Sequence, residues 1–200
     1  MKPCWLVVAL VAGGALTGCG SNETSSQQPH TSPESASTVA APATLTARQY
    51  QPPKQRNQGG RPDVVYDPCT YVNDETIKAL GLDPASRERD DFLAEYTIFD
   101  CKFKSTVRRV TISSGNITME QERTRYAGMI ENLTVNGREA MIVREPEEVP
   151  ESCALNMRTD QGIARISTLL TVEGLYQKLD RCDGIVDIAK AVEPTIGKGK

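Results

Sequence analysis

The chain has 200 residues and a formal net charge of −3, from 26 acidic and 23 basic residues. This balance offers no basic footprint for nucleic acid, so we expect no nucleic-acid partner. The only histidine, His30, lies in a polar stretch that is not expected to fold, which argues against Ser-His and Cys-His catalysis and the usual catalytic zinc site. We expect no cofactor and no metal, because the chain also carries no glycine-rich phosphate-binding motif.

The N-terminal segment has the layout of a signal peptide. Lys2 supplies a positive start, and an apolar stretch follows over Leu6–Ala15. The stretch is too short to span a bilayer and is interrupted by Gly13 and Gly14, which argues against the alternatives of a transmembrane helix or a buried helix. Residues 1–18 are therefore predicted to be a lipoprotein signal peptide.

A lipid-attachment pattern ends this segment. Residues 16–19 read Leu-Thr-Gly-Cys, which is the L-x-G-C pattern at which bacterial lipoprotein precursors are cleaved and acylated on cysteine. Acyl chains on Cys19 would hold the protein on a membrane. We therefore expect a membrane partner through a lipid anchor at Cys19, and a location on the extracytoplasmic face of the cell membrane.

Residues 19–62 are predicted to be the lipidated cysteine and a disordered tether. Between residues 20 and 62 there are six prolines and eleven serines or threonines, and the only large apolar residues are Val39, Leu45 and Tyr50. Such a composition buries too little apolar surface to offset the entropy of folding. Residues 63–200 have the usual size of a single globular domain, which the tether would hold away from the lipid.

The domain begins with a short helix and a pair of strands. The helix is predicted over Asp74–Leu80, with Asn73 as its N-cap and Gly81 as its stop. Apolar residues then alternate with polar ones through Tyr96–Phe103 and again through Val107–Ile112, which indicates a hairpin.

Two further helices are predicted. Thr118 and Gln121 have the spacing of a capping box, and apolar residues recur at helical intervals after them, which favours a helix from 119 to 131. A C-terminal helix ended by Pro194 is indicated by an apolar stripe with steps of three and four residues. The stripe consists of Leu175, Leu179, Cys182, Val186, Ala189 and Val192.

Two tight turns are predicted at Asn136-Gly137 and at 160–162. They join Leu133–Val135 to Ala140–Val143, and Cys153–Arg158 to Ile163–Leu170. The last of these strands is apolar on both faces, so we place it near the centre of the sheet. Together the elements predict an α+β domain, with an antiparallel sheet of about five or six strands and helices packed on it.

Four cysteines remain in the domain once Cys4 and Cys19 are set aside: Cys69, Cys101, Cys153 and Cys182. Outside the membrane they are expected to be oxidised, which gives two disulfides in one of three pairings. We favour Cys69–Cys101 and Cys153–Cys182, because each joins near neighbours in the chain and the C-terminal helix would carry Cys182 to the sheet. A four-cysteine zinc site is the alternative, but no C-x-x-C pair is present.

Several of these features together resemble a known family, the actinobacterial lipoproteins with domain of unknown function 3558. The features are the lipobox ending at Cys19, the Ser/Thr/Pro tether, Asp67-Pro68-Cys69 leading into a helix that ends with Leu80-Gly81-Leu82-Asp83, and the positions of Cys101, Cys153 and Cys182. The resemblance covers about Tyr66 to Ala191. It implies a surface lipoprotein without an assigned reaction, and therefore brings no catalytic residues with it.

Two kinds of charged cluster are candidate sites. Carboxylates gather at Glu145, Glu147, Glu148 and Glu151, and Asp90 adjoins Asp91, but neighbours in sequence do not flank a bond as a glycosidase pair must. The glutamate cluster also lacks the residue order of a calcium loop, and a solvated loop is the simpler interpretation. Two interpretations remain for four basic residues, which are either a patch for phosphate or acidic glycan or exposed strand ends and helix surface: Arg108, Arg109, Arg123 and Arg125.

Two functions from different classes remain. The preferred one is a non-catalytic binding module of the cell envelope, which takes an envelope protein or a small envelope ligand. The alternative is an envelope enzyme that acts through carboxylates. A pocket with converging carboxylates of raised pKa would favour the enzyme, and a shallow face of exposed apolar side chains would favour the binding module.

Overall fold

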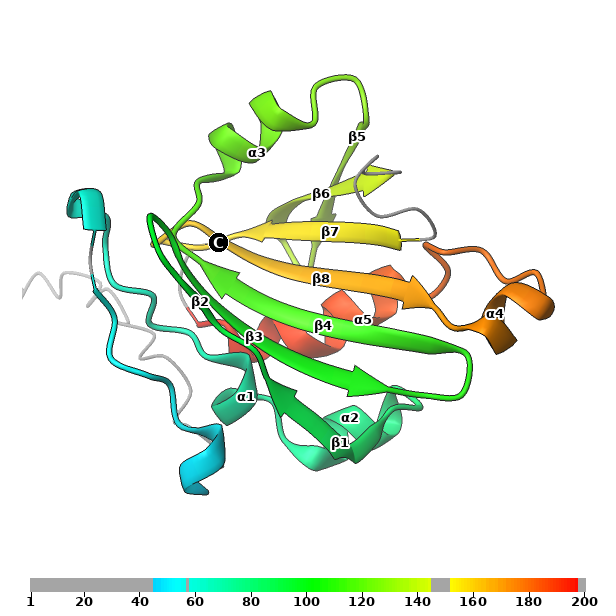
Figure 1. Ribbon diagram of the computed structural model, residues 1–200. Coiled ribbons are helices and arrows are strands. Elements are labelled where there is room, and N and C mark those ends of the chain that lie inside the picture. The colour runs from blue at the N-terminus through cyan, green and yellow to red at the C-terminus, as the bar shows by residue number, and fades with distance from the viewer. Residues whose placement is uncertain (1–44, 57, 145–151, 198–200) are drawn as a thin grey trace, which may run out of the picture. The chain divides into compact units, whose positions relative to one another are not determined.

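The computed structural model describes residues 45–56, 58–144 and 152–197. They form one antiparallel sheet with helices on both of its faces (Figure 1). The predicted lipidation site Cys19, the histidine His30 and the glutamate cluster of residues 145–151 lie outside the described residues.

The sheet has eight strands, all paired antiparallel. Their order is β1-β3-β4-β8-β7-β6-β5, and the short β2 also pairs with β3. The strands are β1 Asp83–Arg89, β2 Phe92–Leu93, β3 Thr97–Lys104, β4 Arg108–Gly115, β5 Ile130–Val135, β6 Arg138–Arg144, β7 Ser152–Arg158 and β8 Ile163–Leu170. The strand β8 lies at the centre, as its two apolar faces predicted.

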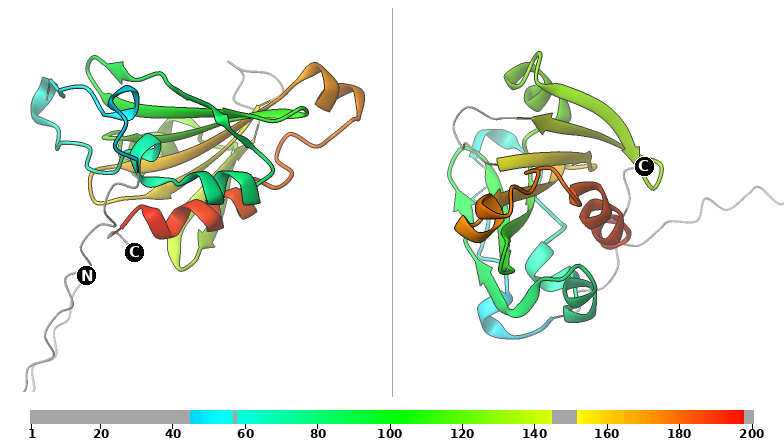
Figure 2. Two further views of the ribbon diagram at one scale, coloured as in Figure 1. Left: turned by 90° about the horizontal axis from the view of Figure 1, so that it is seen from below. Right: turned by 90° about the vertical axis from the view of Figure 1, so that its right-hand side faces the viewer.

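Five α-helices are described, together with short 3-10 turns at Arg48–Tyr50, Gln58–Gly60 and Glu193–Thr195. The helices are α1 Pro68–Tyr71, α2 Asp74–Ala79, α3 Met119–Arg125, α4 Val172–Tyr176 and α5 Ile185–Val192. Helix α5 runs behind the sheet in the view of Figure 1, while α3 lies near its upper edge. Figure 2 shows α5 below the sheet when the molecule is seen from below. We call the face against α5 the back face and the opposite one the front face.

The main hydrophobic core lies on the back face. Alternate residues of the central strands point there, among them Phe103, Ile112 and Ile166, and they pack with Ile77 of α2 and Ile188 of α5. Two smaller apolar clusters lie under α3 on the front face, one around Met119 and Met141 and the other around Tyr126 and Val143. Among the described residues, no helix covers the rest of the front face.

The predicted helix starts and turns are confirmed. Asn73 accepts a hydrogen bond from the backbone N–H of Thr76 at 2.8 Å, and Thr118 with Gln121 forms a capping box. The turn at Asn136-Gly137 has φ of 50° and 85°, which is the left-handed geometry that this residue pair favours.

Three sequence predictions were wrong in their extent. The sheet has eight strands rather than five or six, because the charged sequence of β1 gave no apolar alternation; the only residue that this strand buries is Arg87. Helix α3 ends at Arg125 rather than at 131, since Gly128 takes a φ of 88° and β5 starts at Ile130. The C-terminal helix is broken into α4 and α5.

The break between α4 and α5 leaves Cys182 outside both helices. Lys178 and Gly184 both adopt positive φ between them. The disulfide still forms, since Cys182 bonds to Cys153 with a sulfur–sulfur distance of 2.15 Å, and Cys69 bonds to Cys101 at 2.06 Å. The two disulfides are therefore confirmed, in the pairing that the sequence favoured.

Parts of the described segments 45–56 and 58–62, which composition placed in the tether, contact the domain in the structure. The backbone N–H of Leu45 donates to the carbonyl of Thr70 at 3.0 Å. The side chain of Gln55 makes two hydrogen bonds of 2.8 Å to the backbone of Val64. Arg89 donates to the carbonyl of Tyr50, whose side chain packs against the core.

Candidate functional site: a cationic groove on the front face

Strand alternation sends a set of polar side chains to the front face. Side chains at every second position of a strand point the same way, and residues opposite each other on paired strands share a face. One such row is Lys102, Thr111, Ser167 and Ala154, and the row beside it is Asp100, Ser113, Arg165 and Asn156. A polar floor therefore crosses β3, β4, β8 and β7.

A hollow of about 550 Å³ lies over this floor. This volume is within the range of small-molecule sites. Five basic side chains and one acidic side chain line it: Lys102, Lys104, Arg109, Arg125, Arg165 and Glu88. The hollow is thus cationic in a chain whose net charge is −3. We call it the cationic end of the groove.

The strongest concentration of positive charge is a cross-strand pair. Lys104 at the end of β3 lies directly opposite Arg109 at the start of β4. Lys104 has one weak ion pair, 4.0 Å to Glu88, and the side chain of Arg109 makes no ion pair or hydrogen bond with any described residue. Like charges directly opposite each other destabilise a sheet. The pair is therefore an unfavourable arrangement, which Glu88 offsets only weakly and which a bound anion would relieve.

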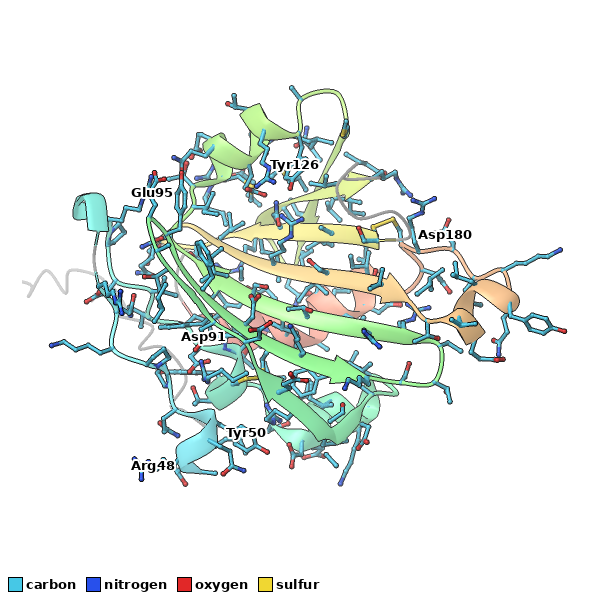
Figure 3. The ribbon with its side chains drawn as sticks, viewed as in Figure 1. Arg48, Tyr50, Asp91, Glu95, Tyr126 and Asp180 are labelled. Atoms are coloured by element: carbon cyan, nitrogen blue, oxygen red, sulfur yellow. A yellow bond between two sulfur atoms is a disulfide. The ribbon has the colours of Figure 1, made fainter. Side chains whose placement is uncertain are left out.

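The wall of the groove is formed by the end of α3. Tyr126 follows the helix, as Figure 3 shows, and its buried ring lies within reach of two guanidinium groups. The Cζ atoms of Arg125 and Arg165 are 5.1 and 5.7 Å from the ring centroid. Both contacts are cation–π interactions, which hold the two guanidinium groups beside the hollow.

A buried ion pair fixes α3 to the sheet beside the groove. Glu122 is buried, and its Oε2 accepts hydrogen bonds of 3.0 Å from Arg165 of β8 and from the Nδ2 of Asn156 of β7. The same arginine donates through Nε to Ser167 at 3.1 Å. This network sets the orientation of Arg165 and holds the carboxylate of Glu122 against it.

A second hollow of about 370 Å³ adjoins the first. Thr111, Arg125, Tyr126, Arg165 and Ser167 line both hollows, and the second adds Asp100, Ser113, Glu122 and the isoleucines Ile98, Ile117 and Ile163. Burial raises the pKa of Asp100 above its usual range, against the lowering effect of its hydrogen bond to Ser113. We call this hollow the carboxylate end of the groove.

The structure brings together two of the four arginines that the sequence singled out. Arg109 and Arg125 line the cationic end. Arg108 instead donates to the carbonyl of Asp183, and Arg123 donates to Asn132 at 2.6 Å and to Glu139 at 2.7 Å. Sequence reasoning missed the other basic groups of the groove, which are Lys102, Lys104 and Arg165.

The aspartates that adjoin in sequence do not form a catalytic pair. Asp90 is exposed and bonds to Lys102, which carries a raised pKa because of that contact. Asp91 is engaged by Arg89 at 3.0 Å and accepts from the backbone N–H of Asp100 at 3.1 Å. The two side chains therefore serve different partners.

The described residues form neither a metal site nor a membrane-spanning helix. Within the stretches 45–56, 58–144 and 152–197, no group of three or more histidine, cysteine, aspartate or glutamate side chains is placed to hold a metal ion. Among the helices of those stretches, none has the length and apolar character needed to cross a bilayer.

Comparison with known proteins gives one match. The model of a family described as "Protein of unknown function (DUF3558)" matches residues 14–195. No curated protein and no solved structure matches the chain.

Proposed function

Because the chain belongs to the DUF3558 family of proteins of unknown function, we propose from its front-face groove that it is a non-catalytic binding module of the cell envelope, whose ligand is anionic. The ligand we propose is a small envelope component rather than a protein. A concave site of this size suits a small molecule, whereas protein interfaces bury much broader surfaces.

The single observation that carries this proposal is the pairing of Lys104 with Arg109. A cross-strand pair of like charges costs stability, and a sequence under selection for folding alone would replace one of the two. An anionic ligand between the two side chains would turn this repulsion into two charge-assisted hydrogen bonds. A local cost that a ligand removes is typical of a functional site.

The alternative of an envelope enzyme acting through carboxylates draws on Asp100, whose pKa is raised by burial and which lines the groove. A paired-carboxylate mechanism needs a second carboxyl across the bond to be cleaved. Glu122 is the other carboxyl at that end, and it is bonded to Arg165 and Asn156. The groove therefore supports binding better than hydrolysis.

We also propose that the protein is a lipoprotein, anchored on the extracytoplasmic face of an actinobacterial cell membrane by acyl chains on Cys19. The support is the Leu-Thr-Gly-Cys pattern at residues 16–19. The two disulfides add to it, because disulfides persist in oxidising compartments. Mass spectrometry of the protein from its membrane fraction tests this: a lipid mass on Cys19 is expected, and an intact residue 1–18 segment would contradict it.

Isothermal titration calorimetry tests the groove: pyrophosphate is titrated into the full chain at low ionic strength. The variant Lys104→Gln/Arg109→Gln removes both positive charges of the pair. It is expected to bind pyrophosphate at least about tenfold more weakly, since hydrogen bonds to charged groups contribute about 1.5–3 kcal/mol each. The matched control Lys78→Gln/Lys190→Gln removes the same charge from α2 and α5, where both lysines are exposed. It is expected to bind as the wild type does.

Two results would contradict the proposal. Equal weakening in both double variants would show that the protein attracts anions through its overall charge rather than at the groove. No binding of pyrophosphate by the wild type would remove the anion site altogether. Turnover of a phosphate ester or of a glycoside that is lost in Asp100→Asn would favour the enzyme instead.

A further inference from the structure

The two ends of the groove differ in chemistry and lie on the same strands. The cationic end has Lys104 and Arg109, and the carboxylate end has Asp100 and Ser113. Ser113 lies four positions after Arg109 on β4, which corresponds to about 13 Å along the strand. Because the two hollows share part of their lining, one elongated ligand can reach both ends.

One acceptor atom at the carboxylate end has no donor, although Ser113 bonds to the same carboxyl group. Oδ1 of Asp100 is buried and has no hydrogen-bond partner among the described residues. A buried acceptor without a donor is costly, because it has lost its water and gained nothing in return. Thr111 lies between the two ends, and its hydroxyl group likewise has no hydrogen-bond partner among the described residues. Its hydroxyl group can donate or accept. A ligand that occupies this end should therefore bring hydroxyl groups.

The donors at this end should be neutral rather than cationic. Arg125 and Arg165 line both hollows, so an ammonium group near Asp100 would lie beside two guanidinium groups. Burial raises the pKa of Asp100 and so disfavours its charged form, and a hydroxyl group, unlike an ammonium group, can bond to the carboxyl group in either protonation state. Hydroxyl groups satisfy both conditions.

We infer that the groove takes a phosphorylated sugar, with its phosphate between Lys104 and Arg109 and its hydroxyl groups against Asp100 and Thr111. This inference rests on the proposed anion-binding function, and it adds the class and the orientation of the ligand. The cationic end supplies affinity for the phosphate, and the carboxylate end selects for the polyhydroxylated part.

The test compares four probes on the full chain by calorimetry: inorganic phosphate, glucose, glucose 6-phosphate and sucrose 6-phosphate. At least one sugar phosphate is expected to bind about tenfold or more tightly than inorganic phosphate, because it adds a hydrogen bond to a charged group. In Asp100→Ala the ratio of the sugar phosphate affinity to the inorganic phosphate affinity should fall to about one, because the hydroxyl groups lose their partner. Asp100→Asn keeps the size of the side chain and should also lose most of the preference.

Each outcome distinguishes the inference from the proposal under it. If phosphate binds through Lys104 and Arg109 but neither sugar phosphate binds more tightly, the sugar assignment is overturned and the anion site stands. The sugar assignment is also overturned if Asp100→Ala and Asp100→Asn unfold at the wild-type temperature and still prefer the sugar phosphate over inorganic phosphate. If no phosphorylated probe binds, the anion site itself fails. Binding of free glucose as tight as that of the sugar phosphates would overturn the assigned orientation.

Discussion

Arg138 and Glu193, which are 55 residues apart in sequence, form an ion pair that is buried on both sides. The Nε of Arg138 donates to Oε1 of Glu193 at 3.0 Å, and the side chains are 0% and 1% exposed. The same guanidinium donates to the carbonyls of Arg158 and Gly197. It therefore joins strand β6 to the C-terminal turn and to the end of β7.

Removing one partner of this pair should be strongly destabilising. Arg138→Met leaves the Glu193 carboxylate buried without its counter-ion, which is expected to lower the free energy of unfolding by about 3–5 kcal/mol. The control Arg144→Met breaks an ion pair to Glu131 whose side chains are 53% and 58% exposed, and should cost less than about 1 kcal/mol. Urea denaturation of both variants measures the difference. Equal losses of unfolding free energy would contradict the expectation that the buried pair stabilises the fold more than the exposed one.

Reversing the charge of Arg109 should separate stability from binding. In Arg109→Glu the new carboxylate faces Lys104 across the strands, so the repulsive pair becomes an attractive one. We expect the free energy of unfolding to stay equal or rise by roughly 0.2–1 kcal/mol, while pyrophosphate binding is lost. Urea denaturation and calorimetry on the same preparation check this. A clear loss of stability would show that Arg109 has a structural role instead.

The disulfide between Cys153 and Cys182 should contribute through the loop that it closes. Its cysteines are 29 residues apart, and Cys153→Ala/Cys182→Ala is expected to lose about 3–4 kcal/mol of unfolding free energy on the chain-entropy model. The variant Cys69→Ala/Cys101→Ala, with a separation of 32 residues, should lose a similar amount. Denaturation without reductant tests both. A midpoint that does not change in either variant would contradict the expected contribution.

Glu139 should make the protein sensitive to acid. Its hydrogen bonds to Arg158 and Arg123 lower its pKa from 4.5 to about 2. The unfolded chain therefore binds the proton more readily than the folded one, and the stabilisation, complete above pH 4.5, is lost as the pH falls toward 2. Glu139→Gln should show a shallower fall in stability over that interval than the wild type. Denaturation midpoints at several acidic pH values test this, and parallel slopes would contradict it.

Much of the fold could be predicted because its signals are local. The capping box of Thr118 and Gln121, the left-handed turn at Asn136-Gly137 and the two faces of β8 each depend on a few neighbouring residues, and each is confirmed. Strand β1 has no such signal, since it is an edge strand with mostly polar residues. The break at Gly184 was missed for a related reason, because the apolar spacing continues across it.

Less of the groove could be predicted, because it depends on strand register. Arg109 and Arg125 stood out as parts of short basic clusters. Arg165 was visible only as a polar residue on a central strand, and its place opposite Ser113 is set by the pairing of β4 with β8. Lys104 and Arg109 are five residues apart, and their opposition could have been found from the predicted hairpin by counting outward from its turn.

The Cys69–Cys101 disulfide also determines how the domain would carry a mechanical load. The described chain starts at Leu45, which bonds to the backbone of Thr70 in α1 on the back of the sheet. A pull from that end reaches α1 first, and the disulfide passes the force directly to β3. The force would therefore enter the sheet at Cys101, which packs in the core on the back face of β3, while Lys102 and Lys104 of the same strand line the groove on the front face.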